Sequence, residues 1–514
     1  MRTKYALKNI YIGLVTQVVI IILGFVSRKV FIDSLGTEYL GVNGVLTNVL
    51  SMMILIESGI GISIVYNLYK PLADGNKDKI CALIKLYKKA YRVLALIMLI
   101  LSCMIYPLLD SLIITDMPIK AMGLVYAIFV SKNIISYLNA YKWALINADQ
   151  KEYVLAKNNL YFQIVTTIGK IIILEVTSSY ILFLSIELII FAIQNIVNTI
   201  VIKRRYPYIN DKRNYTLDIE SKKNINKNVK AMFFHNIGAY LVCSTDNILI
   251  SACISVKAVG LYSNYTMIIS QLTALLNPVI GGIGAGIGNL IATESKDKVY
   301  DIFKTSFFVS FWIYSIATIF LYNLLEPFIN WWIGYGFLLD KFVFLVILLN
   351  FYVGGMRGVI ITFKSKAGLF VQDKYAPVLE GIINLVFSLV LVKYFGLLGI
   401  FLGTTLSTLL VPFWNQARIV YKSLFKISLS NFFISYTKYF CMMMISGIVT
   451  TYLCNSLVDG GSFISLIIRG IICTIVPNLI YITLFYKTDE FQYLYTIGKG
   501  MIGDKFKTRI GRVN

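Results

Sequence analysis

The sequence has little charge and a single histidine. Asp, Glu, Lys and Arg make up only 14% of its 514 residues, whereas a soluble protein carries about 25%. This shortage of charge excludes an ordinary soluble domain. Zinc and di-metal centres are built largely from histidine and paired cysteines. With only His235 and no CxxC pair among the seven cysteines, we expect no metal centre.

Catalytic and nucleotide-binding signatures are also missing. The chain contains no GxxxxGK[ST] loop to cradle phosphates, and no polar stretch is long enough for a large soluble domain. These two absences exclude an ATP-driven pump on this chain. No nucleophile–base pair stands out around His235, so we predict no catalytic residues, no resident cofactor and no enzymatic activity.

Long apolar runs dominate the sequence instead. Hydrophobic residues make up 57% of it, and the mean hydropathy is +0.73. Because about 20 apolar residues span a bilayer as a helix, and continuous runs of that kind form helices rather than barrel strands, we predict an all-α polytopic membrane protein with about fourteen transmembrane helices. The predicted spans are 9–32, 40–66, 84–109, 119–146, 153–175, 180–202, 231–254, 258–291, 303–329, 342–363, 375–394, 396–417, 431–456 and 463–486.

The basic residues are distributed by loop. The net charge of +22 suggests nucleic acid at first, but the Lys and Arg residues form no single patch. Alternate loops and both ends of the chain are rich in them. The opposite loops contain only Lys120, Lys257, Lys341 and Lys393. Lys and Arg accumulate on the cytoplasmic side of membrane proteins, so we expect both termini in the cytoplasm and no nucleic-acid partner.

The first six spans and the next six resemble a repeat. A shift of 219 residues places Gly41 on Gly260, and it places the KDK motif that starts at Lys77 on the one that starts at Lys296. Six spans per half imply two lobes with the same orientation, related by a pseudo-two-fold axis along the membrane normal. The predicted organisation is an N-terminal lobe (1–203), a basic cytoplasmic linker (204–230), a C-terminal lobe (231–422), two further transmembrane helices (423–487) and an amphipathic cytoplasmic tail (488–514).

Charged residues inside apolar runs are the candidate site. Such residues are costly in a bilayer and are functional candidates by default. Seven Lys and Arg residues lie within the apolar runs: Arg28, Lys29, Lys132, Lys142, Lys170, Arg357 and Arg469. We expect Lys142 to snorkel to the cytoplasmic surface, and the candidates for a binding site are Arg28, Lys132, Lys170 and Arg357. One interpretation is that they snorkel to an interface or pair with buried acids. The other is a cationic, water-filled cavity that binds phosphate or acidic sugar oxygens, which Arg holds with two parallel hydrogen bonds.

The acids at comparable depth are Glu57, Glu187, Asp246 and Glu380. They are fewer than the buried cations, which favours an anionic cargo over a cationic one. Asp246, Glu57 and Glu380 are candidates for ion coupling, because intramembrane carboxylates relay protons and bind Na⁺. The alternative is that they only form ion pairs with the buried cations.

Several stretches resemble the bacterial Wzx-type polysaccharide flippases of the MOP superfamily, which also includes the MurJ and MATE transporters. They are STDNILISACISVKAVGLYSNY (244–265) with GIGNLIA (286–292), GLFVQDKYAPVLEGIINLVFSLVLV (368–392), GIFLGTTLSTLLVPFWNQARIVYK (399–422) and SLGTEYLGVNGVLTNVLSMMILIESGIGISIVYNLYKPLA (34–73). The resemblance implies a MATE/MurJ-like fold with two six-helix lobes in a V around a central cavity. In MurJ-like relatives, cations near the outer end of the first span are important, and Arg28 matches that position.

The resemblance also implies a function. We expect ion-coupled alternating access, driven by Na⁺ or H⁺, that flips undecaprenyl-pyrophosphate-linked oligosaccharide across the bacterial plasma membrane for capsule, O-antigen or exopolysaccharide synthesis. Expected partners are this lipid-linked substrate, membrane lipids, a polysaccharide polymerase and glycosyltransferases. The alternatives are a MurJ-type lipid II flippase, a MATE-type multidrug or cation antiporter and, from another class, a membrane glycan polymerase or ligase.

Overall fold

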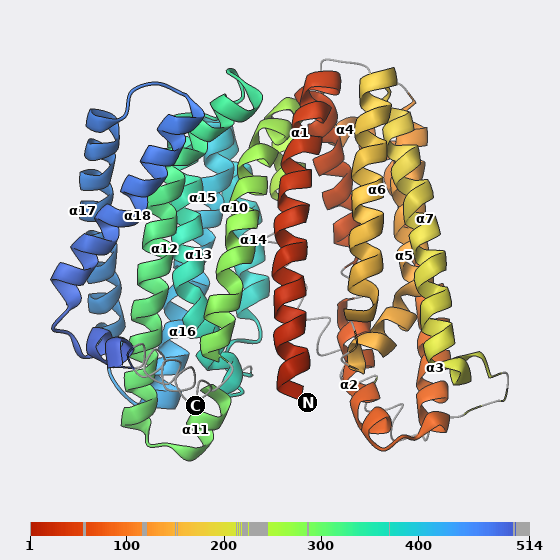
Figure 1. Cartoon of the computed structure of the whole chain (residues 1–514), viewed down its shortest axis with the longest axis horizontal. Helices are drawn as coiled ribbons and strands as arrows, with labels where there is room; N and C mark the ends of the chain where they lie inside the picture. Colours follow the sequence, from red (N-terminus) through yellow and green to blue (C-terminus); the bar gives the residue numbers. More distant parts are fainter. Residues whose placement is uncertain are drawn as a thin grey trace, which may run out of the picture. The chain divides into compact units, whose positions relative to one another are not determined.

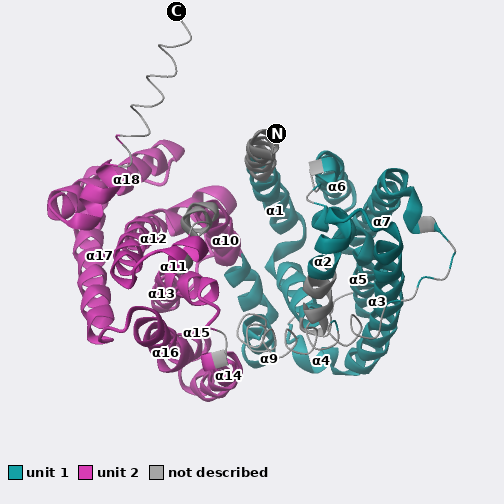
Figure 2. Ribbon diagram, turned by 90° about the horizontal axis from the view of Figure 1, so that it is seen from below, with its two compact units in different colours: residues 1–263 teal, residues 264–514 magenta. Residues whose placement is uncertain are grey.

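The computed structural model shows helices joined by short connections (Figure 1). It describes residues 2–54, 58–115, 121–149, 151, 153–211, 213, 215, 217, 225, 245–284, 287–369, 371–496 and 499. The chain forms two compact units, unit 1 (residues 1–263) and unit 2 (residues 264–514), which are coloured separately in Figure 2. The division falls within a helix, beyond the predicted linker 204–230, so that linker and the predicted lobe boundaries stay predictions.

Unit 1 is a bundle of long helices with short connectors. Its elements are α1 (Arg2–Ile54), α2 (Ser58–Ala73), α3 (Lys77–Ile105), η1 (Tyr106–Leu108), α4 (Leu109–Leu112), α5 (Met122–Ala148), α6 (Tyr153–Thr177), α7 (Tyr180–Arg205), η2 (Pro207–Asn210), α9 (Asp246–Cys253) and the first turns of α10 (Val256–Gly284). Helix α5 packs against α3 and α7, and α6 packs against α1 and α7.

Helix α1 covers the predicted span 9–32 and the part of 40–66 up to Ile54, and α2 begins at Ser58. The expected division between the two spans is present as a break at Gly36, where φ is +82° and ψ is 177°. Glycine adopts positive φ without steric cost because it has no Cβ. The predicted outer loop is therefore reduced to a single-residue change of direction.

Within unit 1, α1 and the start of α10 make an unusually close contact. A Cβ built on Gly41 would overlap the carbonyl oxygen of Val256, and one built on Gly260 would overlap that of Thr37. Small residues permit such close backbone approach between membrane helices. The 219-residue shift relates Thr37 to Val256 and Gly41 to Gly260, so the contact is reciprocal in the repeat.

The described part of the linker lies against the start of α3. The Lys85 ammonium donates to the Arg213 carbonyl oxygen, and the Cys81 thiol donates to the Tyr208 carbonyl oxygen at 3.2 Å. Arg213 and the Tyr215 hydroxyl donate to Asp211 and hold the pKa of its carboxyl well below its usual value.

Unit 2 contains the rest of α10, α11 (Ile287–Thr293), α12 (Lys296–Ile333), α13 (Lys341–Lys366), η3 (Val371–Asp373), α14 (Ala376–Phe395), α15 (Leu397–Thr408), η4 (Leu409–Phe413), α16 (Trp414–Ile419), η5 (Val420–Phe425), α17 (Ser430–Leu457) and α18 (Phe463–Phe485). The segments η4 and η5 are π-helical. Helices α17 and α18 correspond to the two spans predicted outside the repeat.

The repeat is visible in the helix bounds. Helix α3 begins at Lys77 and α12 at Lys296, which is the 219-residue shift of the KDK motif. Both helices are capped in the same way: Asn76 and Ser295 each accept a hydrogen bond from the backbone N–H three residues on, as N-cap side chains do. The same position in each half thus begins the same helix.

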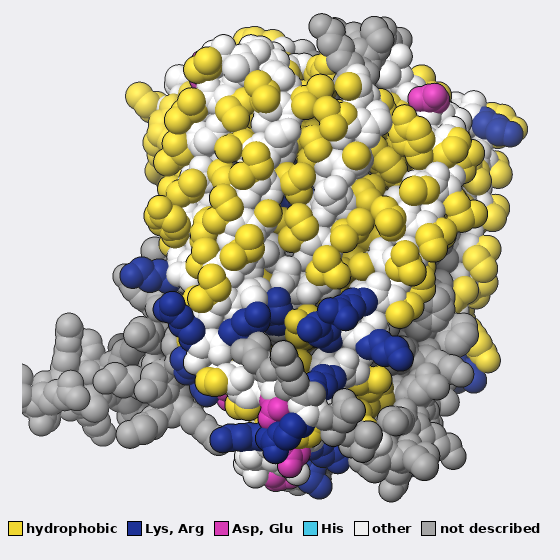
Figure 3. All heavy atoms as spheres, turned by 90° about the vertical axis from the view of Figure 1, so that its right-hand side faces the viewer, with side chains coloured by type: hydrophobic (Ala, Val, Ile, Leu, Met, Phe, Trp, Pro, Cys, Tyr) yellow, Lys and Arg dark blue, Asp and Glu magenta, His cyan; other side chains and the backbone are white. Residues whose placement is uncertain are grey.

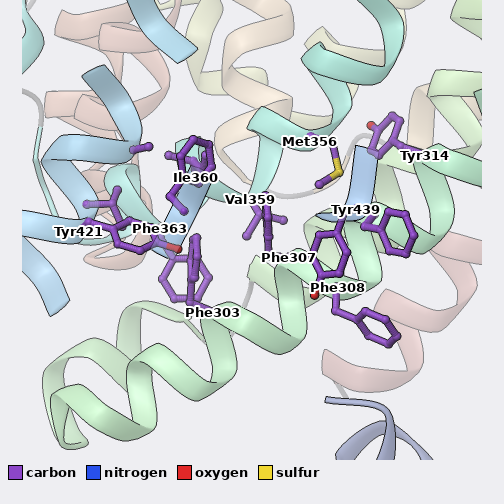
Figure 4. Close-up of a cluster of buried hydrophobic side chains, with 14 of the residues drawn as sticks. Phe303, Phe307, Phe308, Tyr314, Met356, Val359, Ile360, Phe363, Tyr421 and Tyr439 are labelled. Atoms are coloured by element: carbon purple, nitrogen blue, oxygen red, sulfur yellow. The ribbon is translucent and has the colours of Figure 1, made fainter. Parts of the chain in front are cut away.

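An aromatic core holds unit 2 together. Phe303, Phe307 and Phe311 follow one another along α12 at four-residue spacing, so they share one face of the helix. They are at most 2% exposed. Figure 4 shows side chains of this core. Phe311 stacks on Tyr439 of α17 with 4.5 Å between ring centroids, and it also contacts Phe485 of α18. These contacts fix α17 and α18 to the repeat helices.

The protein is a multi-pass membrane protein. Within the described part of the chain, nine helices are long and apolar enough to cross a bilayer. Figure 3 shows a broad apolar band on one face of the molecule, with Lys and Arg gathered at its lower edge. The total of about fourteen spans stays a prediction, because four of the predicted spans (40–66, 119–146, 231–254 and 258–291) include residues outside the described ranges.

Candidate functional site

Two of the predicted cations meet on a single acid. Lys132 of α5 and Lys170 of α6 both form ion pairs with Glu187 of α7, Lys132 with Oε1 and Lys170 with Oε2 at 2.5 Å. Helix α7 packs against both α5 and α6, and each of the three helices contributes one member. We call this group the lysine–glutamate triad. It carries one net positive charge when all three side chains are ionised.

Aromatic rings line the triad. The Lys170 ammonium lies 4.2 Å from the centroid of the Phe183 ring, and that of Lys132 lies 5.6 Å from the Phe191 ring. Such placement over a ring face is attractive for a cation. The side chain of Lys132 is 40% exposed and that of Lys170 is 19% exposed. Lys132 is therefore the member best placed to meet an incoming anion.

Arg28 lies on α1 and reaches α10 within unit 1. Its Nη1 donates to Ser263 Oγ at 2.8 Å. One turn further along α1, Phe31 packs edge-on against Phe183, the ring beneath Lys170, with 5.0 Å between centroids. Arg28 and the triad thus stand on helices that share an aromatic contact.

Asp246 opens helix α9, next to α1. Its Oδ1 is buried and accepts no hydrogen bond from the described residues, and the same holds for Asn247 Oδ1. The other end of α9 is anchored, since Ser251 Oγ donates to the Leu112 carbonyl oxygen and the Val256 N–H donates to that of Ile114. A buried carboxyl oxygen without a hydrogen bond is costly when the group is ionised, so Asp246 suits a proton or a bound cation. Glu57, the second candidate, lies outside the described residues.

The third pair of candidates lies in unit 2. Arg357 of α13 and Glu380 of α14 form an ion pair at 3.5 Å, with side chains 15% and 12% exposed. Glu380 also accepts a hydrogen bond from the Thr408 hydroxyl at 3.4 Å. This pair balances its own charge, unlike the group around Lys132 in unit 1.

Comparison with known proteins identifies the fold. No protein-family model matches this sequence, and no curated protein matches it by sequence similarity. Among solved structures, the lipid II flippase MurJ in an inward closed conformation is similar with a TM-score of 0.64 and 13% identity, over 93% of this chain and 99% of that one. The chain has a MurJ-like fold. An inward-facing multidrug resistance transporter of the MATE family, of the MOP superfamily, gives a TM-score of 0.55 and 12% identity, over 79% of this chain and 98% of that one.

Sequence reasoning noted Glu187 as a buried acid but did not place it at the centre of the candidate site. The signal that points to it is the single acid of α7, which belongs to the same lobe as Lys132 and Lys170. It also expected Lys142 to reach the surface, whereas that side chain is buried and donates to Asn139 at 2.6 Å and to Thr199 at 2.9 Å.

An apolar cavity lies elsewhere in the MurJ-like fold. It measures about 350 Å³ and lies inside unit 2, between α12, α13 and α17. Tyr322, Leu348, Phe440 and Met443 are among its lining residues. None of the predicted charged site residues lines it, so it is separate from the ion pairs described above.

Proposed function

We propose that this protein flips undecaprenyl-pyrophosphate-linked oligosaccharide repeat units across the bacterial plasma membrane for the synthesis of capsule, O-antigen or exopolysaccharide. The observation that carries the proposal is the surplus of intramembrane cations in unit 1, within a MurJ-like fold. Transport of an anionic headgroup explains why cations are kept at a depth where charge is costly.

The charge balance of unit 1 favours an anionic cargo. Lys132 and Lys170 share the single acid Glu187, so the triad carries one net positive charge. A pyrophosphate balances that charge and offers many acceptor oxygens. The guanidinium of Arg28 binds two of these oxygens in parallel, and Lys132, the more exposed lysine, adds a charge-assisted hydrogen bond. A cationic drug meets repulsion at the same place, which disfavours multidrug export.

Asp246 supplies the coupling in this proposal. The cargo or the coupling ion must bind one conformation more tightly than the other, because a ligand with equal affinity for both does not shift the equilibrium between them. A buried carboxyl that accepts no hydrogen bond through Oδ1 gains most from H⁺ or Na⁺, and loses that gain wherever water reaches it. Protonation or Na⁺ binding at Asp246 is therefore the step that biases the transport cycle.

The apolar cavity of unit 2 fits a lipid-linked cargo. Its walls are mostly hydrocarbon and aromatic rings, so it suits the hydrocarbon of an isoprenoid chain. In the proposed orientation both termini are cytoplasmic, as the basic loops indicate. The glycosyltransferases that build the repeat unit act on the cytoplasmic side, and the polymerase acts on the far side.

A second cargo is also supported. The similar MurJ structure is that of a lipid II flippase, and lipid II is itself a polyprenyl-pyrophosphate-linked saccharide. The same cations suit both headgroups, so the sugar distinguishes the two candidates and the cations do not.

Depletion of the protein in its own cells tests the proposal. Lipids are extracted and identified by mass spectrometry, and the cells are complemented with wild type, Lys132→Gln, Lys132→Arg or the control Lys393→Gln, an exposed lysine on α14. We expect a repeat unit on undecaprenyl pyrophosphate to accumulate. Wild type and Lys393→Gln relieve the accumulation fully, Lys132→Arg relieves it partly and Lys132→Gln fails.

The other outcomes are equally clear. Accumulation of lipid II supports the second cargo. No accumulation of either lipid, together with a changed sensitivity to cationic dyes, refutes the flippase proposal and favours a multidrug antiporter. Asp246→Asn is examined in the same cells: relief equal to wild type, with unchanged dependence on the ion gradient, excludes Asp246 as the coupling group.

A further inference from the structure

Four cations converge on one face of unit 1, away from the lysine–glutamate triad. Lys88 and Arg92 stand one turn apart on α3, and Lys203 lies in the last turn of α7. Helix α5 packs against both of these helices, and its Lys142 ammonium donates to Thr199, one turn before Lys203. The charges lie close enough to repel one another: Lys88 is repelled by Arg92 and Lys203, and Lys142 is repelled by Lys88 and Lys203. None of the four forms an ion pair with a described acid. We call this group the α3–α7 basic cluster.

The cluster contains a built element. The Lys142 side chain is only 9% exposed, and its ammonium donates to Asn139 at 2.6 Å and to Thr199 at 2.9 Å. Two polar side chains therefore hold a buried cation beside the exposed Lys88 and Lys203. Packing like charges together without a counter-charge is unfavourable, so the arrangement calls for an anion that the described chain does not supply.

The cluster lies where an apolar surface begins. Directly after Arg92, Val93 is 50% exposed and Leu96 is 58% exposed, and just before Lys203, Ile200 is 45% exposed. Figure 3 shows Lys and Arg side chains along the lower edge of the apolar band on this side of the molecule. In a membrane this is the level of the lipid headgroups. An anion with a charged headgroup at that level and a hydrocarbon portion in the apolar band fits this surface.

The repeat shows what covers the equivalent position in unit 2. The shift of 219 residues relates Lys88 to Phe307 and Arg92 to Phe311. Phe307 packs on Tyr439 of α17, and Phe311 packs on Phe485 of α18 as well. Unit 2 therefore uses this face of α12 to dock α17 and α18, through rings. In unit 1 the same positions of α3 are exposed cations, so a different, negatively charged occupant is needed.

We propose that the α3–α7 basic cluster binds the phosphate of an anionic phospholipid, with the two acyl chains lying along the apolar faces of α3 and α7. The phosphate oxygens accept hydrogen bonds from Lys88, Arg92 and Lys203, and Lys142 adds positive charge from below. The rule that cytoplasmic loops are basic accounts for cations at this level. That rule does not account for the buried Lys142 in the cluster. It also does not account for Lys88 and Arg92 at positions where the second repeat has the aromatic rings that pack on α17 and α18.

The test uses the purified full chain and native mass spectrometry, with phosphatidylglycerol or phosphatidylcholine added in detergent. The variant is Lys88→Gln/Lys203→Gln. Its matched control is Lys89→Gln/Arg204→Gln, which removes two exposed cations from the neighbouring positions of the same helices. We expect wild type and the control to retain phosphatidylglycerol over phosphatidylcholine, and the variant to retain it about tenfold less well.

Two results overturn the proposal. If the variant and the control lose phosphatidylglycerol equally, only total charge matters and no site exists. If soluble glycerol phosphate displaces the lipid at equal concentration, the cluster binds a free phosphate group and the acyl chains contribute nothing. Thermal unfolding of both variants in phosphatidylcholine confirms that they are folded. The assay contains no flippase cargo, so its failure would leave the proposed transport function untouched.

Discussion

Replacing Glu187 with Gln should destabilise unit 1 strongly, because one acid serves two lysines. Glu187→Gln keeps the shape of the side chain and removes its charge. Lys170, whose ammonium lies 2.5 Å from Oε2 and whose side chain is 19% exposed, is then left as a mostly buried cation without its counter-ion. Breaking a buried ion pair from one side costs about 3–5 kcal/mol.

The two lysines should contribute unequally. The side chain of Lys132 is 40% exposed, so water screens its pair with Glu187 and that pair contributes about 1 kcal/mol or less. The side chain of Glu187 is 22% exposed, which lowers the upper estimate for the buried pair. We therefore expect Glu187→Gln to lower the free energy of unfolding by about 2–4 kcal/mol, mainly through Lys170.

A double-mutant cycle measures this directly. Unfolding is followed by denaturant titration in detergent for Glu187→Gln, Lys170→Met and the double variant. The coupling energy should exceed about 1 kcal/mol, and the same cycle with Lys132→Met should give a smaller value. The exposed ion pair between Lys341 and Glu326, at 2.9 Å, serves as the reference. Additive effects at Glu187 and Lys170 would refute the assignment of the triad.

Two further predictions concern packing. Gly41→Leu should separate α1 from α10, because even a Cβ at Gly41 overlaps the Val256 carbonyl oxygen. The variant should express poorly and unfold at a lower temperature than the control Gly354→Leu. Gly354 is a helical glycine with open space around its Cβ position. Phe311→Ala should cost about 3–5 kcal/mol, since the ring is fully buried against Tyr439, and unchanged unfolding in a denaturant titration would contradict the aromatic core.

Much of the fold could be predicted because the membrane leaves few choices. Apolar runs of about 20 residues must be helices, and predicted spans such as 180–202 and 463–486 agree with α7 and α18 to within a few residues. The break at Gly36 lies within the predicted connection between the first two spans, 33–39. Its form, a single residue with positive φ in place of a loop, could not be predicted, because it depends on how the helix segments on both sides pack.

The site was harder to predict than the fold. Position along the sequence gives the depth of a charged side chain in the membrane, but it does not give the direction in which the side chain points around the helix. That direction decides whether Lys132 and Lys170 face solvent, lipid or Glu187. The triad joins three helices, and its partners follow from the packing of α5, α6 and α7, which no local pattern encodes. Hydropathy therefore identified Arg28 and the lysines as candidates without identifying their partners.

The contact between α1 and α10 has the symmetry of a dimer interface within a single chain. Residue 37 meets residue 260, and residue 41 meets residue 256, where each pair joins one repeat to the other. Two identical subunits related by a two-fold axis make contacts of this isologous kind. A half-chain that carries this surface could therefore pair with a second copy of itself through the same contact. The two sides need not be identical within one chain: Thr37 and Val256 differ, whereas Gly41 and Gly260, which the backbone approach requires, are the same.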